Sequence, residues 1–133
     1  MSTVATVLVI EDDAPSLELA VYLLEGAGYA TVSARDGPDG LAAALRGGFD
    51  LVLCDLQLPG LNGFEVFARL PRPPDPAAVP VVALTAFSMP GDRERVVEAG
   101  FTGYLTKPIE PELFVSQVEQ YLRPDRLAAR TPR

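Results

Sequence analysis

The 133-residue sequence contains no histidine, and this absence excludes several kinds of chemistry at once. It rules out a Ser-His or Cys-His catalytic pair, a histidine zinc site and a phosphohistidine carrier. Cysteine is almost as scarce, because the lone Cys54 excludes an internal disulfide and a metal site built from several thiolates. Cys54 itself is expected to be buried filler in the core.

Positive charge is also scarce. Eleven Lys and Arg residues stand against 18 Asp and Glu, for a formal net charge of −7, and only Lys107 is a lysine. This balance argues against nonspecific nucleic-acid binding, which needs Lys and Arg to displace phosphate counterions. No apolar run approaches the roughly 18 residues of a membrane span, and Met1–Ala5 lacks the basic flank of a secretory signal. The sequence therefore predicts a cytoplasmic protein with no nucleic-acid or membrane partner.

The length and composition indicate one globular domain. Hydrophobic residues make up 48% of the chain and charged residues 22%, values typical of a folded soluble protein. No internal repeat or domain linker is visible. We expect one domain over residues 1–122, followed by a tail over 123–133 that is frayed or part-helical.

Short apolar runs alternate along the chain with longer amphipathic stretches. Strands are expected at 7–10, 29–34, 51–54, 81–84 and 103–105. Helices are expected at 16–25, 37–45, 63–70, 92–99 and 110–122. The alternation predicts a doubly wound α/β fold with a central parallel five-stranded sheet, in the flavodoxin-like order 2-1-3-4-5, with Rossmann-like orders as the alternative. Five prolines in 71–80 predict an extended, polyproline-like connection.

Polar side chains stand just past the ends of four expected strands, and in the order 2-1-3-4-5 these strands are neighbours. Ligands of such sheets bind outside the carboxyl ends of the strands. One pocket would therefore hold at least three carboxylates, a hydroxyl and an ammonium group. The residues concerned are Glu11, Asp12, Asp13, Asp55, Thr85 and Lys107.

This set of side chains suits metal-assisted phosphoryl transfer. Clustered carboxylates need a cation, and oxygen ligands without Cys or His favour Mg²⁺, Mn²⁺ or Ca²⁺. A carboxylate such as Asp55 can attack phosphorus and form an aspartyl-phosphate, while the metal, Lys107 and Thr85 offset charge on the phosphoryl oxygens. The acidity and the lack of a glycine-rich cradle after the first strand argue against FMN or a dinucleotide.

Each of these residues also has a simpler interpretation when it is taken alone. Asp13 is expected to be a helix N-cap, Asp55 could cap a turn, Thr85 could be a strand-end hydroxyl, and Lys107 could be solvated. The occurrence of suitable groups at four separate strand ends favours the functional interpretation.

Five segments of the chain match the motifs of one known family: 7–13, 51–60, 62–66, 80–86 and 107–108. Through them the chain resembles, over about residues 5–122, the response-regulator receiver family of two-component signalling, the CheY-like superfamily. Segments 85–89, 91–92 and 104–109 look especially like the stand-alone receivers that control cell division and cell fate in some bacteria.

The resemblance implies that Asp55 is the phosphoacceptor and that Glu11 and Asp12 form the acidic pair. Asp12 would bind Mg²⁺ (or Mn²⁺) directly, Glu11 would bind it through water, and Gln57 would contribute its backbone carbonyl. The acidic run also allows a second register, with Asp12 and Asp13 as the pair.

The resemblance further implies that Thr85 and Lys107 contact the phosphoryl group and that Ala86 keeps the approach open. Tyr104 matches the aromatic switch that turns inward when Thr85 moves, shifting the population of the face formed by helix four, strand five and helix five. The bond between Lys107 and Pro108 is usually cis in the family.

Two features depart from the commonest pattern of the family. Phe87 occupies a position that is often polar or charged, and our hypothesis is that it hinders hydrolysis of the aspartyl-phosphate. The proline-rich segment 71–80 is either a rigid surface for a partner or a stiffened loop.

The implied function is that of a single-domain response regulator, which catalyses only its own phosphorylation and dephosphorylation. Its partners would be a histidine kinase or histidine phosphotransfer protein and a downstream protein target. The competing class is a Mg²⁺-dependent phosphatase or phosphotransferase of the haloacid-dehalogenase type, but such enzymes carry an acid where this chain has Gln57. A degenerate receiver used only for docking is the third possibility, and the intact set Asp12, Asp55, Thr85 and Lys107 argues against it.

Overall fold

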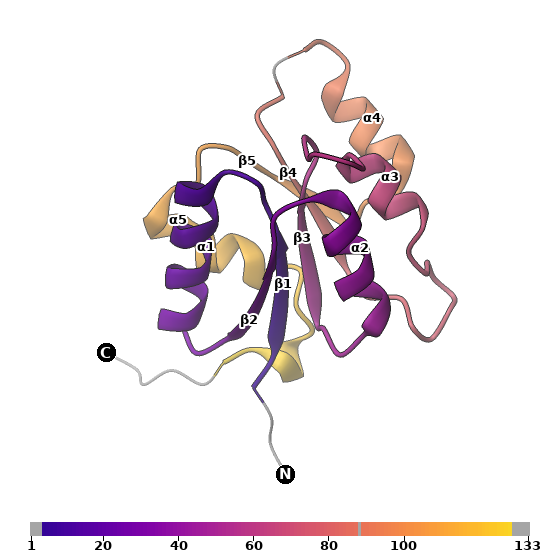
Figure 1. Ribbon diagram of the computed structural model, residues 1–133. Helices are drawn as coiled ribbons and strands as arrows, with labels where there is room; N and C mark the ends of the chain where they lie inside the picture. Colours follow the sequence, from indigo (N-terminus) through magenta and orange to yellow (C-terminus); the bar gives the residue numbers. More distant parts are fainter. Residues whose placement is uncertain (1–3, 88, 129–133) are drawn as a thin grey trace.

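The computed structural model describes residues 4–87 and 89–128, and in this range it contains one parallel five-stranded sheet (Figure 1). The strand order is β2-β1-β3-β4-β5, so the predicted flavodoxin-like fold is confirmed. The strands are β1 (Thr6–Ile10), β2 (Ala30–Ala34), β3 (Leu51–Asp55), β4 (Val81–Thr85) and β5 (Gly103–Thr106).

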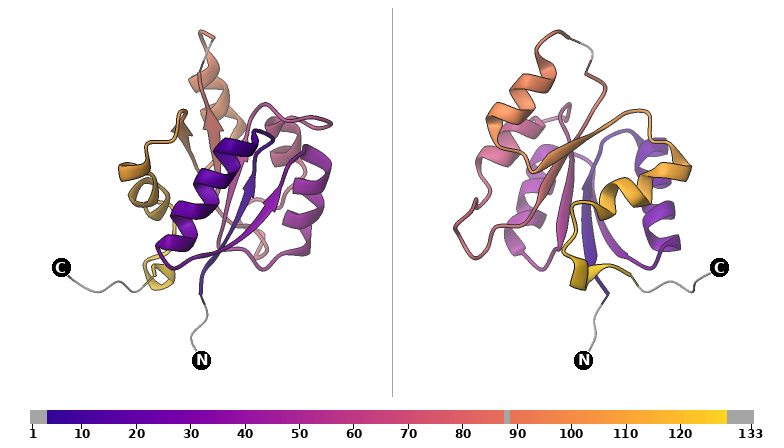
Figure 2. Two further views of the ribbon diagram at one scale, coloured as in Figure 1. Left: turned by 60° about the vertical axis from the view of Figure 1, so that its left-hand side comes forward. Right: turned by 180° about the vertical axis from the view of Figure 1, so that it is seen from behind.

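Helices cover both faces of the sheet: α1 and α5 lie on one face and α2, α3 and α4 on the other (Figures 1 and 2). Helix α4 has the predicted bounds, whereas α3 and α5 end earlier than predicted, because their last residues form tighter turns. The helices are α1 (Ala14–Gly26), α2 (Gly37–Arg46), α3 (Gly63–Ala68), α4 (Asp92–Ala99) and α5 (Pro111–Glu119), with a 3₁₀ turn at Pro124–Arg126.

Alternation along the buried strands divides the core into two layers. Val7 and Val9 of β1 pack in the layer that includes residues of α1 and α5, whereas Leu8 and Ile10 pack in the layer that includes residues of α2, α3 and α4. Strands β1, β3 and β4 are buried on both faces, as in other parallel sheets. Cys54 is fully buried in the second layer, as predicted, and burial raises the pKa of its thiol to about 12.

Side-chain caps define where three helices begin, at the carboxyl edge of the sheet. Asp13 accepts a hydrogen bond from the Ser16 N–H at 3.0 Å, which confirms the predicted N-cap of α1. Asp36 caps α2, and Asn62 forms a capping box with Glu65 at the start of α3. These caps set the paths by which β1, β2 and β3 lead into the following helices.

The proline-rich connection 71–80 contains neither helix nor strand, as predicted, but the expectation of an extended polyproline-like path was wrong. Hydrogen bonds from the Asp75 N–H to the Arg72 carbonyl and from the Ala78 N–H to the Asp75 carbonyl close two turns. The Asp75 carboxylate also accepts from the Ala77 N–H at 2.9 Å. The non-proline residues keep their N–H groups, and an aspartate that bonds its own backbone favours turns over an extended path.

The C-terminal segment lies against the edge of the sheet where the strands begin (Figure 2). This edge is opposite to the carboxyl edge. Arg126 of the 3₁₀ turn donates two hydrogen bonds to Asp50, at 2.8 and 3.2 Å, and the Ala128 N–H donates to the Tyr29 hydroxyl at 3.0 Å. The tail is thus part-helical at Pro124–Arg126, while residues 129–133 of the predicted tail lie outside the described residues.

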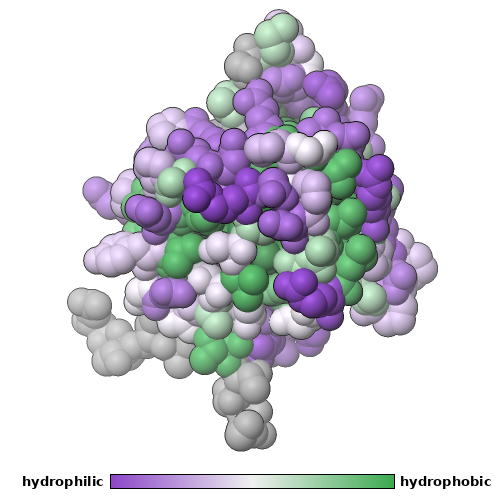
Figure 3. All heavy atoms as spheres, viewed as in Figure 1, coloured by the Kyte–Doolittle hydropathy of each residue, from purple (hydrophilic) through white to green (hydrophobic). Residues whose placement is uncertain are grey.

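The surface mixes hydrophilic and hydrophobic residues, with hydrophilic ones more extensive on the face seen in Figure 3. In the described part of the chain, no helix has both the length and the apolar character needed to cross a membrane. The prediction that the N-terminus is not a secretory signal concerns Met1–Ala5, and residues 1–3 of this segment lie outside the described residues.

Candidate functional site

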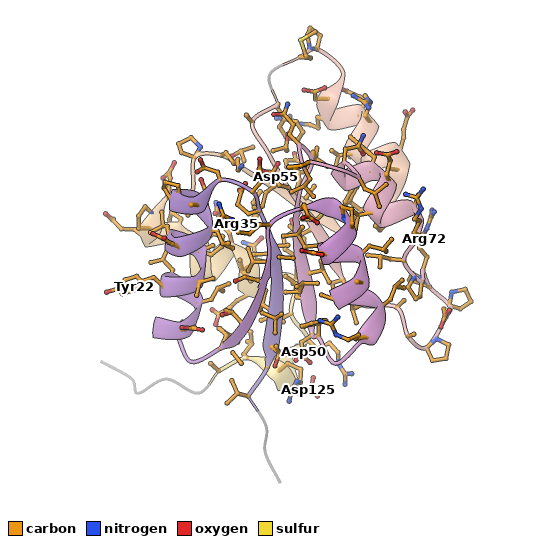
Figure 4. The ribbon with its side chains drawn as sticks, viewed as in Figure 1. Tyr22, Arg35, Asp50, Asp55, Arg72 and Asp125 are labelled. Carbon is orange, nitrogen blue, oxygen red and sulfur yellow. The ribbon has the colours of Figure 1, made fainter. Side chains whose placement is uncertain are left out.

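The carboxyl edge of the sheet brings the predicted residues of four strands together. Asp55 and Thr85 are the last residues of β3 and β4, Glu11 follows β1 directly, and Lys107 follows β5 directly. A cleft of about 640 Å³ opens here, at the end of the sheet where Asp55 is labelled in Figure 4. The predicted residues that line it are Asp12, Asp55, Gln57, Thr85, Ala86 and Lys107.

Lys107 is held by two carboxylates. Its Nζ donates a hydrogen bond to Asp55 Oδ2 at 2.7 Å and lies 2.7 Å from Glu11 Oε1. Its backbone N–H donates to the Thr85 carbonyl at 2.9 Å, and the Lys107–Pro108 peptide bond is cis, as the family resemblance implies. Burial alone would lower the pKa of Lys107, but its contacts with Asp55 and Glu11 outweigh burial and raise it.

Both oxygens of Asp55 have hydrogen-bond donors, which orient the carboxylate. Oδ2 accepts from Lys107, and Oδ1 accepts from the Gln57 N–H at 3.0 Å. Asp55 is only 5% exposed, yet it lines the open cleft. The carboxylate is therefore buried, oriented and reachable from one side. The predicted role of the Gln57 carbonyl as a metal ligand stays a prediction.

Glu11, Asp12 and Asp55 form an acidic cluster in which one oxygen of each carboxylate lies within 4.8 Å of the others. Asp13 points its carboxylate at Ser16, and these hydrogen bonds lower its pKa. The arrangement thus favours the pair Glu11 and Asp12 over the alternative register with Asp13.

Glu11 of this cluster has a strongly shifted pKa. Burial raises the pKa of Glu11 to about 7, and a hydrogen bond with Asp55 adds to the rise while Lys107 opposes it. Glu11 Oε1 lies 2.7 Å from Lys107 Nζ, the same distance at which Lys107 contacts Asp55, so a single ammonium group serves two carboxylates. Three clustered carboxylates with one lysine between two of them suit a hard divalent cation such as Mg²⁺.

Thr85, Phe87 and Tyr104 form a connected group beside the cleft. Thr85 Oγ1 accepts from the Phe87 N–H at 3.1 Å. Phe87 adopts a positive φ of 49°, unusual for a residue other than glycine. Its ring packs edge-on against the half-buried Tyr104, with ring centroids 4.9 Å apart. The predicted switch residue therefore has a physical connection to Thr85 through Phe87.

Sequence reasoning missed the contribution of α4 to this site. The Arg93 guanidinium lies over the Phe87 and Tyr104 rings, at 5.5 and 5.7 Å from their centroids. Arg95 lines the cleft and lies 4.7 Å over the Phe64 ring of α3. In the sequence, α4 is recognisable only as a polar helix with two arginines. The local sequence does not determine which side chains these arginines contact.

Comparison with curated proteins and solved structures gives a consistent result. Residues 7–119 match the family described as the response regulator receiver domain. The polar-differentiation response regulators DivK of Brucella anthropi and of Brucella ovis are both 37% identical over 117 residues, which cover 88% of this chain and 95% of each relative.

Two solved structures illustrate the similarity of the fold. The chemotaxis response regulator CheY4 of Vibrio cholerae has a TM-score of 0.81 at 29% identity, over 90% of this chain and all of that one. The receiver domain of a sensor histidine kinase of Pseudomonas aeruginosa, with magnesium coordinated in its active-site cleft, has a TM-score of 0.79 at 28% identity, over 90% and 98%. The chain therefore belongs to the response regulator receiver domain family of two-component signalling.

Proposed function

We propose that Asp55 accepts a phosphoryl group from a histidine kinase or a histidine phosphotransfer protein. The observation that carries the proposal is the orientation of the buried Asp55 carboxylate in an open cleft, by Lys107 on one oxygen and by the Gln57 N–H on the other. In the reaction an Asp55 oxygen forms a bond to phosphorus while the bond from phosphorus to the donor nitrogen breaks, and the nitrogen keeps the electron pair.

The acidic cluster supports Mg²⁺ as the cofactor, with Mn²⁺ as an alternative. Asp12, Asp55 and the Gln57 carbonyl would bind it directly, and Glu11 would bind it through water. When bound, the ion offsets negative charge on the phosphoryl oxygens. Lys107 and Thr85 would contribute a cation and a hydroxyl donor to the phosphoryl oxygens.

The proposed output is a shift of the face formed by α4, β5 and α5 toward a downstream protein target. The Thr85 hydroxyl now accepts from Phe87, whose ring packs on Tyr104. If Thr85 turns toward a phosphoryl group, this contact changes and Tyr104 is free to move inward. Ala86, beside Thr85, keeps the approach to Asp55 open.

Phe87 supports a second, narrower proposal, that it slows hydrolysis of the aspartyl-phosphate. The side chain lines the cleft and is held there by Tyr104 and Arg93. A bulky apolar ring at this position hinders the attacking water. Replacing Phe87 by Glu should shorten the phosphoryl lifetime, measured by the decay of the phosphorylated mass, and an unchanged lifetime would refute the role.

The chain would act as a switch and not as an enzyme on other substrates, in the cytoplasm, with its receiver unit over residues 1–122. The position two residues after Asp55 is Gln57, where the competing phosphatase class needs an acid. The Brucella relatives are named polar-differentiation response regulators, which supports a role in cell fate. The segment 71–80 would serve as a stiffened loop between α3 and β4.

Intact-mass measurement tests the central proposal. After incubation with Mg²⁺ and a small phosphodonor we expect one phosphoryl adduct, which is absent in Asp55→Asn and in the presence of EDTA. Lys107→Met serves as a second variant, in which the adduct should form more slowly. An adduct that persists in Asp55→Asn would overturn the assignment.

A further inference from the structure

The cleft around Asp55 is larger than a phosphoryl group needs, and it continues into the space between α3 and α4. Its lining includes Phe64 of α3 and Asp92 and Arg95 of α4, in addition to the residues at the strand ends. Helices α3 and α4 lie side by side on the same face of the sheet (Figures 1 and 2). A donor that carries more than its phosphoryl group can therefore meet residues of both helices.

Arg95 is positioned at this part of the cleft with its donors available. Its guanidinium lies 4.7 Å over the Phe64 ring, and Nη1 is 3.8 Å from Asp92 Oδ1. Asp92 is itself anchored, because Oδ2 accepts from the Met89 N–H at 2.9 Å. The Arg95 side chain is 64% exposed and donates no hydrogen bond to any of the described residues. Stacking thus orients the guanidinium without using its N–H groups.

Along the cleft, the charge of Arg95 is less completely neutralised than that of Lys107. Lys107 lies 2.7 Å from both Asp55 and Glu11, so two carboxylates already neutralise its charge. Arg95 has only the looser contact with Asp92. An anionic donor entering this acidic cleft therefore meets one cation that is not tightly paired.

We propose that Arg95 is a specificity-determining residue that favours small acyl phosphates as phosphodonors. The inference rests on the proposed phosphorylation of Asp55. In this reaction an Asp55 oxygen forms a bond to phosphorus, the bond from phosphorus to the acyl oxygen breaks, and the carboxylate leaves with the electron pair. Negative charge grows on the leaving carboxylate, and a guanidinium pairs well with such a group.

Phosphoramidate provides the contrasting donor. Its nitrogen is already protonated, so cleavage of the phosphorus–nitrogen bond releases neutral ammonia. No anion leaves toward α4, and Arg95 gains no interaction as the bond breaks. The two donors share the attack by Asp55 and the cation requirement, and they differ in the charge of the leaving group.

The test compares rates of adduct formation by intact mass, with acetyl phosphate and with phosphoramidate, in Mg²⁺ and below donor saturation. Arg95→Gln should slow the reaction with acetyl phosphate roughly two- to fivefold, the effect expected of one solvent-exposed charge interaction, and leave the phosphoramidate rate nearly unchanged. Arg95→Lys should restore part of the rate. The matched control is Arg46→Gln, which removes the same charge from the end of α2, away from the cleft.

Equal slowing with both donors would show that Arg95 acts on a feature common to both reactions, such as attraction of the anionic donor or the fold of the cleft, and would overturn the inference, as would an unchanged rate with acetyl phosphate. Both results leave the phosphorylation of Asp55 standing, because the wild-type chain still forms the adduct. A wild-type chain that forms no adduct with either donor would instead overturn the proposed function, and the inference with it.

Discussion

The two ends of strand β3 carry similar ion pairs in different surroundings. Asp55 ends the strand and lies 2.7 Å from Lys107, whereas Asp50 directly precedes the strand and lies 2.8 Å from Arg126. The two aspartates stand at opposite ends of the sheet (Figure 4). An acid and a base at hydrogen-bond distance therefore do not by themselves distinguish a functional site from a structural contact.

The two ends of the strand differ in whether the partners of an acid outweigh the effect of burial on its pKa. Burial alone would raise the pKa of Asp50, but hydrogen bonds from Arg126 and from the Thr6 N–H outweigh it and hold the pKa below its usual value. At the other end, burial raises the pKa of Glu11 to about 7, and the contact with Lys107, which Glu11 shares with Asp55, does not outweigh it. A buried acid whose partners do not outweigh its burial, beside a cleft, points to a ligand, whereas an acid whose partners outweigh its burial points to a structural contact.

Replacing each aspartate by asparagine should give the largest difference between the two ends of the strand. Asp55→Asn should form no phosphoryl adduct and stay folded. Asp50→Asn should form the adduct at close to the wild-type rate but lose about 1–3 kcal/mol of unfolding free energy, because it weakens charged hydrogen bonds. Intact mass and urea unfolding measure the two effects. A folded Asp50→Asn chain that forms no adduct would contradict the comparison.

The tight packing behind Asp55 can be tested with Gly63. A Cβ at this position would lie 2.5 Å from the Asp55 carbonyl oxygen and 2.8 Å from Leu56 Cα. Gly63→Ala should therefore cost about 1–3 kcal/mol of unfolding free energy and slow phosphorylation, because the backbone of Asp55 must move. Gly26→Ala is the control, since an added Cβ there would meet no atom within 4 Å apart from its chain neighbours and the backbone of its own helix. Equal stability of both variants would show that the site tolerates displacement.

The dependence of stability on pH should have opposite signs at the two ends. The folded pKa of Glu11 is raised, so its contribution is fully present below its usual value of 4.5 and is lost as pH rises through about 7. The folded pKa of Asp50 is lowered, so its contribution is present above its usual value and is lost as pH falls.

In EDTA, Glu11→Gln should remove the fall in unfolding free energy between pH 4.5 and 7, worth roughly 1–3 kcal/mol. Asp50→Asn should keep that fall. It should instead reduce the loss of unfolding free energy that occurs as pH falls through the pKa of Asp50. Urea unfolding across the pH range gives the measurement. A fall of the same size in Glu11→Gln would show that another group causes it.

The smallest expected effect concerns the C-terminal segment. Arg126→Gln should lower the urea midpoint by less than Asp50→Asn does, because Asp50 keeps its hydrogen bond from the Thr6 N–H. Arg123→Gln is the control, since its ion pair with Asp125 is largely exposed. Phosphorylation should be unchanged in both variants. A loss of phosphorylation in Arg126→Gln would show that the two ends of the sheet are coupled.

The sequence by itself determined the strands and the set of groups at the strand ends, and it limited the strand order to the flavodoxin-like arrangement or Rossmann-like ones. Apolar runs such as 51–54 and the cap at Asp13 are local patterns, and the parallel topology then brings Asp55, Thr85 and Lys107 to one edge. These features follow from short-range periodicity together with a general rule of the fold.

Only the tertiary structure decided which side chains meet across the chain. Arg126 reaches Asp50 over a separation of 76 residues, and Arg95 meets Phe64 because α4 packs beside α3. The positive φ of Phe87 and the turns around Asp75 depend on hydrogen bonds within irregular segments. An exposed arginine has the same local pattern whichever neighbour it reaches, so its role depends on packing that no short stretch of sequence encodes.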